Sequence, residues 1–378
     1  MNYDDAPEEA EFRHALRTWL RDNIPTEEPS PDDEEAHMAF MNEWHKTLYA
    51  GGWLGLTWPE HAGGRGLSPV YEGIFNEELG AANAPPAPSN FGFLAKAILG
   101  FGTEEQAARF LPTMLKGEER WCQGFSEPGA GSDLAALRTR ADLDGDHYVV
   151  NGQKVWTTFA KWADWCLLLA RTDQEAPKHK GISALVLRMD TPGVTVRPLH
   201  MINDNTELAE VFFDDVVVPA DQLIGRPGDG WNIAMRTFAY ERGPAEIGSI
   251  ARGERRLHNL EAAAAKGKYG ESTEVGVRLA RTYMYLEVLR LQVLRSLSQQ
   301  VKHGVPGPEG SADKLIMIRF EQDLPRVEMD LEGAAPALGE DDETLHEYLY
   351  SRAVSIYGGT AQVQKNIIAQ RVLGMPRA

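Results

Sequence analysis

Cysteine is scarce in this sequence of 378 residues: only Cys122 and Cys166 occur, and they form no Cys-x-x-Cys pair. A disulfide framework or a zinc site built from thiolates needs more sulfur ligands than this chain offers. Two isolated cysteines are typical of small buried apolar side chains in a reducing compartment. We therefore expect a cytoplasmic protein that folds around an apolar core.

Long apolar runs and an excess of positive charge are also missing. No run of about 18 consecutive apolar residues occurs, so no segment is expected to span a membrane. The N-terminal stretch MNYDDAPEEAEF is acidic and lacks the apolar stretch of a signal peptide. With 38 Lys and Arg against 56 Asp and Glu, the net charge is −18, which repels the phosphates of nucleic acids. Neither a membrane nor a nucleic acid is an expected partner.

Motifs for metals and dinucleotides fail at their defining positions. The run from Asp142 to Asp146 starts like a calcium loop, but His147 and Gln153 stand where that loop requires glycine and glutamate. We therefore predict a turn between two strands at this point. The ten histidines show no metal-ligand spacing, and no metal site is expected. The glycines at 129 and 131 lack the strand and helix that surround a dinucleotide fingerprint.

What the chain does contain is a change of pattern along its length. Residues 1–120 show apolar residues at helical spacing, residues 121–228 show short β-type runs between turns, and residues 229–378 show long amphipathic helices. This order predicts an α+β chain with segregated domains. The expected domains are an N-terminal α-helical domain (1–120), a middle antiparallel β-barrel domain (121–228) and a C-terminal helical bundle (229–378).

The middle zone predicts a hairpin followed by further strands. Two β-type runs, 148–150 and 153–158, flank Asn151-Gly152, a pair that favours a tight two-residue turn. If the second run is a strand, Lys154, Trp156 and Thr158 alternate onto one face. Further strands are expected at residues 165–170, 182–187, 194–196 and 211–218. Short strands at these intervals indicate a small antiparallel barrel or sandwich.

The C-terminal zone predicts two long helices joined by a loop rich in proline and glycine, then a broken helix. Apolar residues in 274–303 recur at helical spacing and form one stripe. The stripe comprises Leu286, Leu289, Val293, Leu294 and Leu297. The loop spans residues 304–311, and the third helix (343–373) is expected to break near Gly358-Gly359.

Two segments have the residues of a ligand site. The stretch 121–133 combines tight-turn glycines with hydroxyls, so its backbone N–H groups could approach a flat polar ligand, or it could be an ordinary glycine turn. Trp156 could stack on an aromatic ring while Thr158 offers a hydroxyl, or the two could be a core tryptophan and an ordinary strand threonine. The residues alone leave these alternatives open.

Together, these motifs resemble the acyl-CoA dehydrogenase family of flavoproteins, nearly from end to end. The closest signatures are SEPGAGSD at 126–133, NGQKVWTT at 151–158 and YGGTAQVQ at 357–364. Weaker similarity covers 52–66, GTEEQ at 102–106 and Leu111-Pro112. The resemblance implies N-terminal helices, a middle β domain and a C-terminal four-helix bundle, with FAD bound between the β domain and the bundle.

The resemblance also implies which residues bind the cofactor and the substrate. Phe125 and Ser126 would line the pyrimidine side of the flavin, and Trp156 and Thr158 would lie beside the ring, with Thr158 hydrogen-bonded to N5. Ser132 would contact the pantetheine arm of CoA. The implied cofactor-binding positions are Phe125, Ser126, Gly131, Ser132, Trp156, Thr158, Gly359, Thr360 and Gln362. Of these, Thr360 and Gln362 resemble the pair that contacts the adenosine half of FAD, usually across subunits.

Dehydrogenation of a thioester also needs a carboxylate base opposite the flavin, in a dry cleft that raises its pKa. Many family members carry that base where this chain has Gly358, which has no side chain. A second family position, at the start of the C-terminal domain, holds Glu241 here. We therefore predict Glu241 as the α-proton base, although a solvated helix carboxylate is the plainer alternative. Arg242 matches a family arginine next to the base and is predicted as a substrate-site residue that steadies the local charge, with a simple ion-pair residue as the alternative.

Two further departures concern assembly. The family's Arg-x-x-Phe-Gly segment, which grips the FAD diphosphate of a neighbouring subunit, is missing from 261–274. The family's Gln-x-x-Gly-Gly-x-Gly segment is missing from 337–348. Similar losses occur in actinobacterial members that act on sterol side-chain CoA esters and assemble as α2β2 heterotetramers with a paralogous chain. A homotetramer and an α2β2 heterotetramer are both compatible with the sequence.

The resemblance implies an FAD-dependent acyl-CoA dehydrogenase in lipid metabolism, acting in β-oxidation of fatty acids or sterol side chains. It would convert an acyl-CoA thioester into the trans-2-enoyl-CoA, with hydride transfer to flavin N5 and electron-transfer flavoprotein as acceptor. One alternative is a half-site subunit of a heteromeric dehydrogenase. Another is an oxidase or monooxygenase of the same fold.

Overall fold

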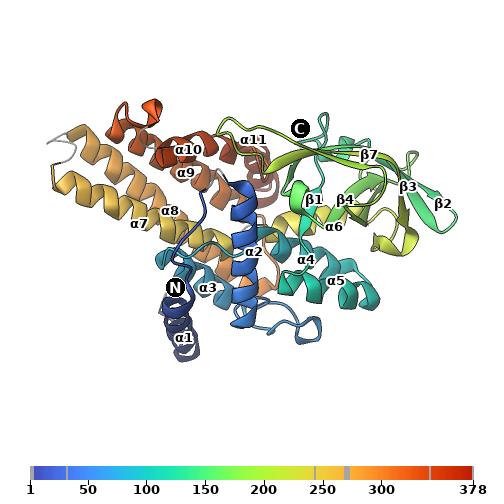
Figure 1. Cartoon of the computed structure of the whole chain (residues 1–378), viewed down its shortest axis with the longest axis horizontal. Coiled ribbons are helices and arrows are strands. Elements are labelled where there is room, and N and C mark those ends of the chain that lie inside the picture. The colour runs from blue at the N-terminus through green and yellow to red at the C-terminus, as the bar shows by residue number, and fades with distance from the viewer. Residues whose placement is uncertain (1–3, 31–32, 242–243, 268–272, 340–341, 377–378) are drawn as a thin grey trace. The chain divides into compact units, whose positions relative to one another are not determined.

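The computed structural model describes residues 4–30, 33–241, 244–267, 273–339 and 342–376 (Figure 1). The chain forms two compact units. The sheet unit consists of Thr26–Gly66 and Pro88–Glu241, and the bundle unit consists of Met1–Pro25, Leu67–Ala87 and Arg242–Ala378. Each unit is built from separated stretches of sequence. The expected domain boundaries near residues 120 and 228 follow chain order and stay a prediction.

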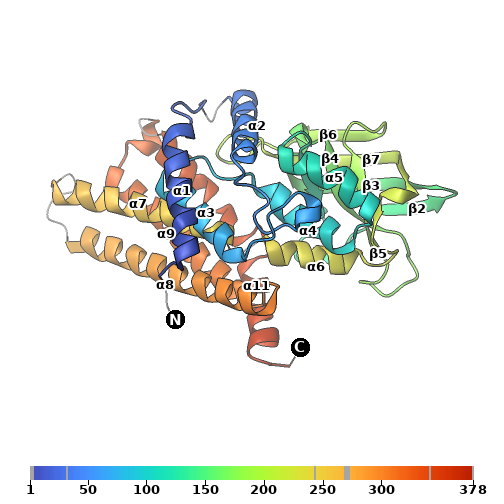
Figure 2. The same ribbon diagram turned by 90° about the horizontal axis from the view of Figure 1, so that it is seen from below.

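The bundle unit consists of helices, shown from below in Figure 2. They are α1 (Pro7–Asn23), α3 (Pro69–Ala81), α7 (Pro244–Ala265), α8 (Thr273–His303), α9 (Gly310–Glu332), α10 (Asp342–Tyr350) and α11 (Ala361–Ile367). In this unit α8 packs on α7 and α9, and α3 packs on α1 and α7. The long helices and the break before α11 confirm the expected pattern of the C-terminal zone.

The core of the bundle unit contains the stripe expected from the sequence. Of its five residues, Leu286, Leu289, Val293 and Leu297 of α8 are buried and pack in one cluster with residues such as Phe320 of α9, whereas Leu294 is only half-buried. Close approach of α3 and α7 depends on glycine. A Cβ on Gly80 would lie 2.4 Å from the carbonyl oxygen of Gly248, so only the smallest residue fits there.

The described residues of the sheet unit form an eight-stranded sheet and the α-helices α2 (Glu34–Ala50), α4 (Ser89–Phe101), α5 (Glu104–Lys116) and α6 (Gly230–Tyr240). The strands are β1 (Trp121–Gly124), β2 (Arg140–Asp144), β3 (His147–Thr158), β4 (Trp165–Arg171), β5 (Ile182–Arg188), β6 (Val194–Pro198), β7 (Leu208–Pro219) and β8 (Leu223–Ile224). Their order is β6-β7-β3-β2-β4-β5-β8, with β1 paired to β4. Helices α4 and α6 pack against strands of this sheet.

The sheet confirms the expected strands and a mainly antiparallel middle β domain, while its closure into a barrel or sandwich stays a prediction. The β1–β4 and β2–β4 pairs are parallel, and the other pairs are antiparallel. The strand path runs from β6 at one end to β8 at the other. The spacing of apolar runs along the sequence shows where strands lie, but not which strands pair. It therefore could not reveal that strands distant in the sequence, such as β1 and β4, pair in parallel.

The predicted Asn151-Gly152 turn is wrong, because β3 continues through both residues. The two-residue hairpin connection is Gly145-Asp146, between Asp144 of β2 and His147 of β3. This confirms the turn that we predicted in place of a calcium loop. At Gly152 the β3–β7 register shifts, and a Cβ there would lie 2.6 Å from Thr139 Cα. The glycine therefore serves a bulge and a close backbone approach rather than a turn.

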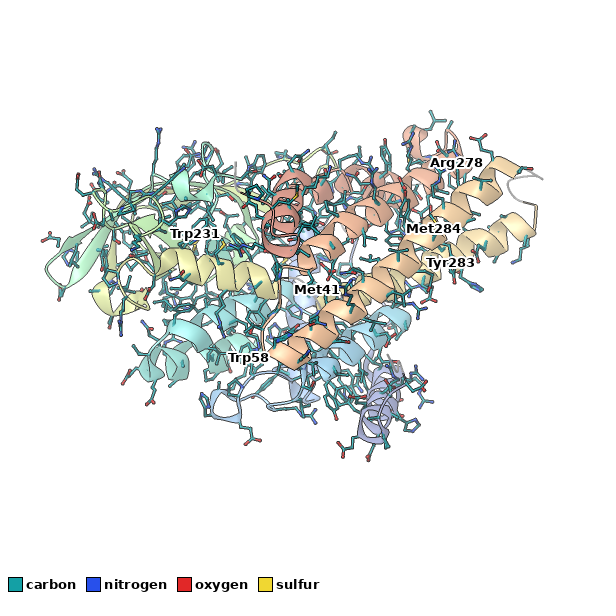
Figure 3. The ribbon with its side chains drawn as sticks, turned by 180° about the vertical axis from the view of Figure 1, so that it is seen from behind. Met41, Trp58, Trp231, Arg278, Tyr283 and Met284 are labelled. Atoms are coloured by element: carbon teal, nitrogen blue, oxygen red, sulfur yellow. The ribbon has the colours of Figure 1, made fainter. Side chains whose placement is uncertain are left out.

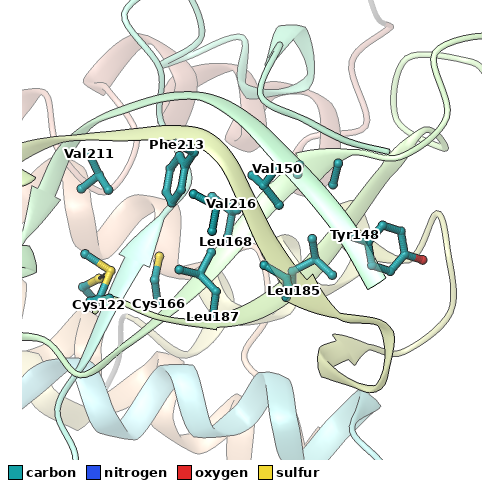
Figure 4. Packing of buried hydrophobic residues seen from close by; sticks show 14 of the residues in the cluster. Cys122, Tyr148, Val150, Cys166, Leu168, Leu185, Leu187, Val211, Phe213 and Val216 are labelled. Carbon is teal, nitrogen blue, oxygen red and sulfur yellow. Dashed lines mark hydrogen bonds between the residues drawn. The ribbon is translucent and has the colours of Figure 1, made fainter. Parts of the chain in front are cut away.

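The core of the sheet unit lies among the strands, as Figure 4 shows. Val150, Leu168, Leu185 and Phe213 are among its buried side chains. Cys122 and Cys166 belong to this core as free, buried thiols in directly paired positions of β1 and β4. Hydrogen bonding to Cys166 and burial raise the pKa of Cys122, which makes it a structural and not a reactive thiol.

Within the described ranges, no helix is both long enough and apolar enough to cross a bilayer.

Candidate functional site

The sheet unit brings together segments that are far apart in the sequence. Val155 N–H of β3 donates to the carbonyl of Ser126 at 3.0 Å, which places the loop 125–133 beside β3. The ring of Phe125 is 3% exposed and packs edge-on against Phe238 of α6, with centroids 5.7 Å apart at 79°. The loop, the end of β3 and the end of α6 therefore form one site.

Trp156 is the most unusual residue of this site. It has a φ of 60°, in the left-handed region that non-glycine residues rarely adopt, and its side chain is 61% exposed. The β3–β7 register shifts between Lys154 and Thr157, so Trp156 lies in a bulge. Backbone strain of this kind is concentrated at functional sites. A large indole held outward next to the half-buried Thr158 is suited to contact a planar ligand.

Lys154 does not share the exposed face with Trp156, contrary to the predicted alternation. The bulge adds a residue and breaks the two-residue period, so the side chain of Lys154 is fully buried. Its Nζ donates to the carbonyl of Phe125 at 3.0 Å and to Glu127 Oε1 at 2.9 Å. Burial lowers the pKa of Lys154 to about 8, although the attraction of Glu127 opposes this shift. The ammonium therefore remains charged at neutral pH.

Glu127 is the counterion and is itself anchored. Its carboxylate accepts the backbone N–H of Arg138 at 2.6 Å and that of Thr139 at 2.8 Å. Burial opposes ionisation, but the ammonium of Lys154 and these hydrogen bonds lower the pKa of Glu127 below its usual value. Glu127 and Lys154 lie in two separate sequence motifs, 126–133 and 151–158. Their pairing across 27 positions could not be inferred from either motif.

The glycine-rich loop exposes its far end. Glu127 and Ala130 exchange backbone hydrogen bonds of 3.2 and 3.0 Å, which close the turn. Gly131 and Ser132 beyond it are exposed, and a Cβ on Gly131 would meet open space. Asp133 pairs at the surface with Lys178 at 2.6 Å. The exposed hydroxyl of Ser132 is accessible to a ligand, as its predicted role requires.

Helix α6 carries the predicted base at its end. Glu241 is the C-cap residue, and its N–H donates to the carbonyl of Thr237 at 3.1 Å. Glu241 lies three residues after Phe238, the residue whose ring contacts Phe125. Residues three apart lie on the same face of a helix, so Glu241 is on the face of α6 that carries Phe238. The structure thus brings Glu241 to the same end of α6 as the loop. Arg242, the predicted substrate-side residue, lies outside the described residues.

Sequence reasoning missed two cations at this end of α6. The Nζ of Lys96 on α4 lies 5.3 Å from the centroid of the Tyr240 ring, and the guanidinium of Arg236 lies 5.5 Å from it. Lys96 also donates to Thr57 Oγ1 at 3.0 Å. Cation–π contacts of this kind hold an aromatic ring in place. These contacts fix the ring of Tyr240, the residue before Glu241. The contact of Lys96 could not be predicted, because no local sequence pattern links α4 to α6.

The start of α6 is fixed by a backbone contact, which yields a testable expectation. A Cβ on Gly230 would lie 2.6 Å from the carbonyl carbon of Ser183 in β5. Replacing Gly230 by alanine should therefore cost about 1–3 kcal/mol of unfolding free energy and shift the helix that carries Glu241. Urea unfolding measures the loss. The matched control is Gly276→Ala in α8, where a Cβ meets nothing within 4 Å; it should be neutral or stabilising. Equal behaviour of the two variants would contradict this account of α6.

The remaining predicted cofactor residues belong to the bundle unit. Gly359 precedes α11, Thr360 caps it by accepting the N–H of Val363 at 3.2 Å, and Gln362 is exposed on its first turn. Gln364, which sequence reasoning missed, is fully buried. The structure brings these residues together at one helix start. Their expected meeting with residues of the sheet unit stays a prediction.

Gln364 holds the loop that precedes α11. Its Nε2 donates to the carbonyls of Gly358 and Gly359 at 3.0 and 3.2 Å. Both glycines have left-handed φ values, 61° and 88°, which side-chain-bearing residues disfavour. Gly358 therefore serves the backbone of this turn and offers no side chain that could act as a base. In 261–274, where the diphosphate-binding motif is missing, residues 268–272 lie outside the described residues.

The donor set of the sheet unit fits a flavin. An exposed indole, a neighbouring hydroxyl and a loop with accessible backbone are the groups that bind a flat, polar, aromatic ring. In the described ranges, no cluster of three or more His, Cys, Asp or Glu side chains could hold a metal ion. Helices, then a sheet with this site, then helices again form an α+β chain whose site is of the kind that a flavin-dependent oxidoreductase requires.

Comparison with known families agrees with this class. The acyl-CoA dehydrogenase N-terminal domain matches residues 6–118, the middle domain matches 122–216 and the C-terminal domain matches 228–373. The chain belongs to the acyl-CoA dehydrogenase family, and it is an enzyme of that oxidoreductase class.

Individual relatives cover the whole chain. Acyl-CoA dehydrogenase IpdE1 of Mycobacterium tuberculosis is 41% identical over 379 residues, which are 97% of this chain and 98% of the relative. The ChsE4–ChsE5 complex of the same organism is a solved structure that matches with a TM-score of 0.86, 31% identity and full coverage of both chains. The structure described as the Tcur3481–Tcur3483 steroid acyl-CoA dehydrogenase matches with a TM-score of 0.85, 30% identity and full coverage.

Proposed function

We propose that this chain is an FAD-dependent acyl-CoA dehydrogenase in which Glu241 removes the α-proton of the thioester. The observation that carries this proposal is the position of Glu241 at the end of α6, where Phe238 packs on the loop of Phe125, while Gly358 has no side chain to act as base. When bound, FAD supplies the hydride acceptor at N5. The product is the trans-2-enoyl-CoA.

The other site residues bind and orient. Trp156 stacks beside the flavin ring, and the hydroxyl of Thr158 directs a hydrogen bond at N5. Phe125 and Ser126 line the pyrimidine side of the flavin, Gly131 is a cofactor-binding position of the same loop, and Ser132 contacts the pantetheine arm of the substrate. In the bundle unit, Thr360 and Gln362 contact the adenosine half of FAD, and Gly359 is a further cofactor-binding position. The exposure of Trp156, Ser132 and Gln362 supports these roles.

The substrate proposed is a bulky or branched acyl-CoA, of which a steroid-derived thioester is the best candidate. Two observations support it. The similar Tcur3481–Tcur3483 structure is described as a steroid acyl-CoA dehydrogenase. In this chain the proposed base Glu241 lies at the end of α6, and Gly358 carries no side chain, an arrangement compatible with a bulky acyl group. Electron-transfer flavoprotein is the proposed electron acceptor.

The assembly proposed is an α2β2 heterotetramer with a paralogous chain, with a homotetramer as the alternative. The similar ChsE4–ChsE5 and Tcur3481–Tcur3483 structures are each named for two proteins. Helix α8 also exposes apolar residues at spacings of seven, four and three, which is the pattern of a helix face that packs on another helix. These residues are Val277, Met284, Val288 and Leu291. Figure 3 labels Met284 and its neighbour Tyr283 on this helix.

The visible flavin spectrum tests the proposal directly. The chain is purified alone and together with a paralogous partner, and spectra are recorded anaerobically before and after addition of a panel of acyl-CoA esters. We expect the flavin of the assembled enzyme to bleach when bulky or steroid-derived esters are added. On denaturation the enzyme should release this flavin as FAD. Bound flavin that no ester bleaches would overturn the dehydrogenase proposal. Stoichiometric flavin in the chain alone would favour the homotetramer.

A further inference from the structure

The buried ion pair of Lys154 and Glu127 takes no part in the proposed proton or hydride transfer, yet it lies directly behind the loop that the flavin is proposed to touch. Burial of an ammonium is costly, and the lowered pKa of Lys154 reflects that cost. Apolar residues of similar volume often replace a buried ion pair without loss of stability. Stability alone therefore does not explain why this ion pair is present. Its hydrogen bond to the backbone of the loop gives a better explanation.

The ammonium holds one particular peptide group. Lys154 Nζ donates to the carbonyl of Phe125 at 3.0 Å. The described residues contain no cis peptide bond, and in a trans peptide the carbonyl and the next N–H point in opposite directions. Fixing the Phe125 carbonyl toward Lys154 therefore turns the N–H of Ser126 away from it. Within the described chain this N–H has no protein acceptor, so it is available to a ligand.

Further contacts make this hold rigid. Val155 N–H donates to the Ser126 carbonyl at 3.0 Å, so the next carbonyl is fixed as well. Glu127 joins the ammonium to the backbone N–H groups of Arg138 and Thr139, just before β2. The loop is thus attached through one charge pair to β3 and to the start of β2. An exposed pair, Lys178 with Asp133, holds the far end of the same loop.

We propose that Lys154, together with Glu127, is a positioning pair that aims the Ser126 N–H at the flavin ring. The inference rests on the proposed function, because it requires that the loop bind flavin. Neither side chain contacts the ligand. Their effect is exerted through the direction of one peptide group, which makes the affinity and the electronic environment of the flavin depend on a residue behind the site.

The experiment compares variants of the assembled, FAD-loaded enzyme. Lys154→Met removes the tether but leaves a buried carboxylate, so that variant also loses stability. Lys154→Met/Glu127→Gln removes both charges and keeps an amide oxygen that can accept from Arg138 or Thr139. Lys178→Met is the matched control, because it removes an exposed tether of the same loop, where solvent weakens ion pairs. For each protein we measure the urea midpoint, the Kd for FAD and the visible spectrum of bound flavin.

The double variant separates positioning from stability. We expect it to recover the urea midpoint of the wild type while its Kd for FAD stays at least about tenfold weaker and its bound-flavin spectrum stays shifted, since one aimed hydrogen bond to a ligand is worth about that factor. Lys178→Met should stay within about twofold of wild type, as expected for exposed pairs.

A double variant that binds FAD like the wild type, with an unchanged spectrum, would overturn the positioning role and leave the proposed function standing. A double variant that fails to fold would also overturn it, since the pair would then be needed for the fold itself. If the wild-type assembly binds no flavin, the proposed function fails, and this inference fails with it.

Discussion

Glu241→Gln is expected to leave FAD bound and to slow the reduction of flavin by acyl-CoA at least about 10³-fold, within the range that general bases contribute. Glutamine keeps the size and polarity of the side chain but cannot accept the α-proton. The C-cap hydrogen bond at the end of α6 uses the backbone N–H of residue 241, and glutamine keeps that donor. Anaerobic stopped-flow absorbance measures the rate, and the flavin spectrum before mixing measures occupancy.

The matched control for this variant is Glu254→Gln. Glu254 is an exposed carboxylate of α7 that lies 13 positions after Glu241 in the sequence. The same change of charge at Glu254 should leave the rate of flavin reduction within about twofold of the wild-type rate. If Glu241→Gln reduced its flavin at the wild-type rate, the base would have to be another residue. If it lost FAD, Glu241 would instead be a structural residue of the site.

Gln364→Leu is expected to weaken FAD binding at least about tenfold and to lower the unfolding free energy by about 2–3 kcal/mol, the cost of removing a fully buried hydrogen-bonding side chain. Its amide is a shared donor to the carbonyls of Gly358 and Gly359. Leucine fills a similar volume but leaves both carbonyls without this donor. The turn that presents Gly359 and Thr360 would then lose its fixed shape. Urea unfolding and equilibrium dialysis with FAD measure the two effects.

Lys365→Ala is the control at the adjacent position. Lys365 is exposed on α11, so its removal should change stability by no more than about 0.5 kcal/mol and leave FAD binding unchanged. Wild-type affinity for FAD in Gln364→Leu would show that the turn keeps its shape without the buried amide. A loss of affinity in Lys365→Ala of the same size would assign the effect to α11 as a whole.

Regular elements of this fold are predictable where one local cause dominates. The predicted stripe of α8 repeats at helical spacing, and the structure buries all of it except the half-buried Leu294. Strands β4 and β5 are continuous apolar runs bounded by turns, and the structure confirms both. In these segments the preference of the chain and the demands of packing agree.

The irregular positions could not be predicted, because a distant partner decides them. Asn151-Gly152 has the composition of a turn, but pairing with β7 and the approach of Thr139 keep it within β3. The bulge at Trp156 reverses the side on which Lys154 lies, so simple alternation misplaces that residue. The cations beside Tyr240 come from another helix. Family motifs identified which segments matter, but not how their side chains are arranged.

The interleaved construction of the two units has a consequence for synthesis on the ribosome. Helix α3 (Pro69–Ala81) has its packing partner in α7 (Pro244–Ala265), and the intervening chain includes every strand of the sheet. Helix α1 can already pack on α3, but the face of α3 that packs on α7 must stay uncovered until the later part of the chain has emerged. During that interval the sheet unit can already fold, whereas α3 is the natural client of a chaperone. The last third of the message therefore decides when α3 is fully packed.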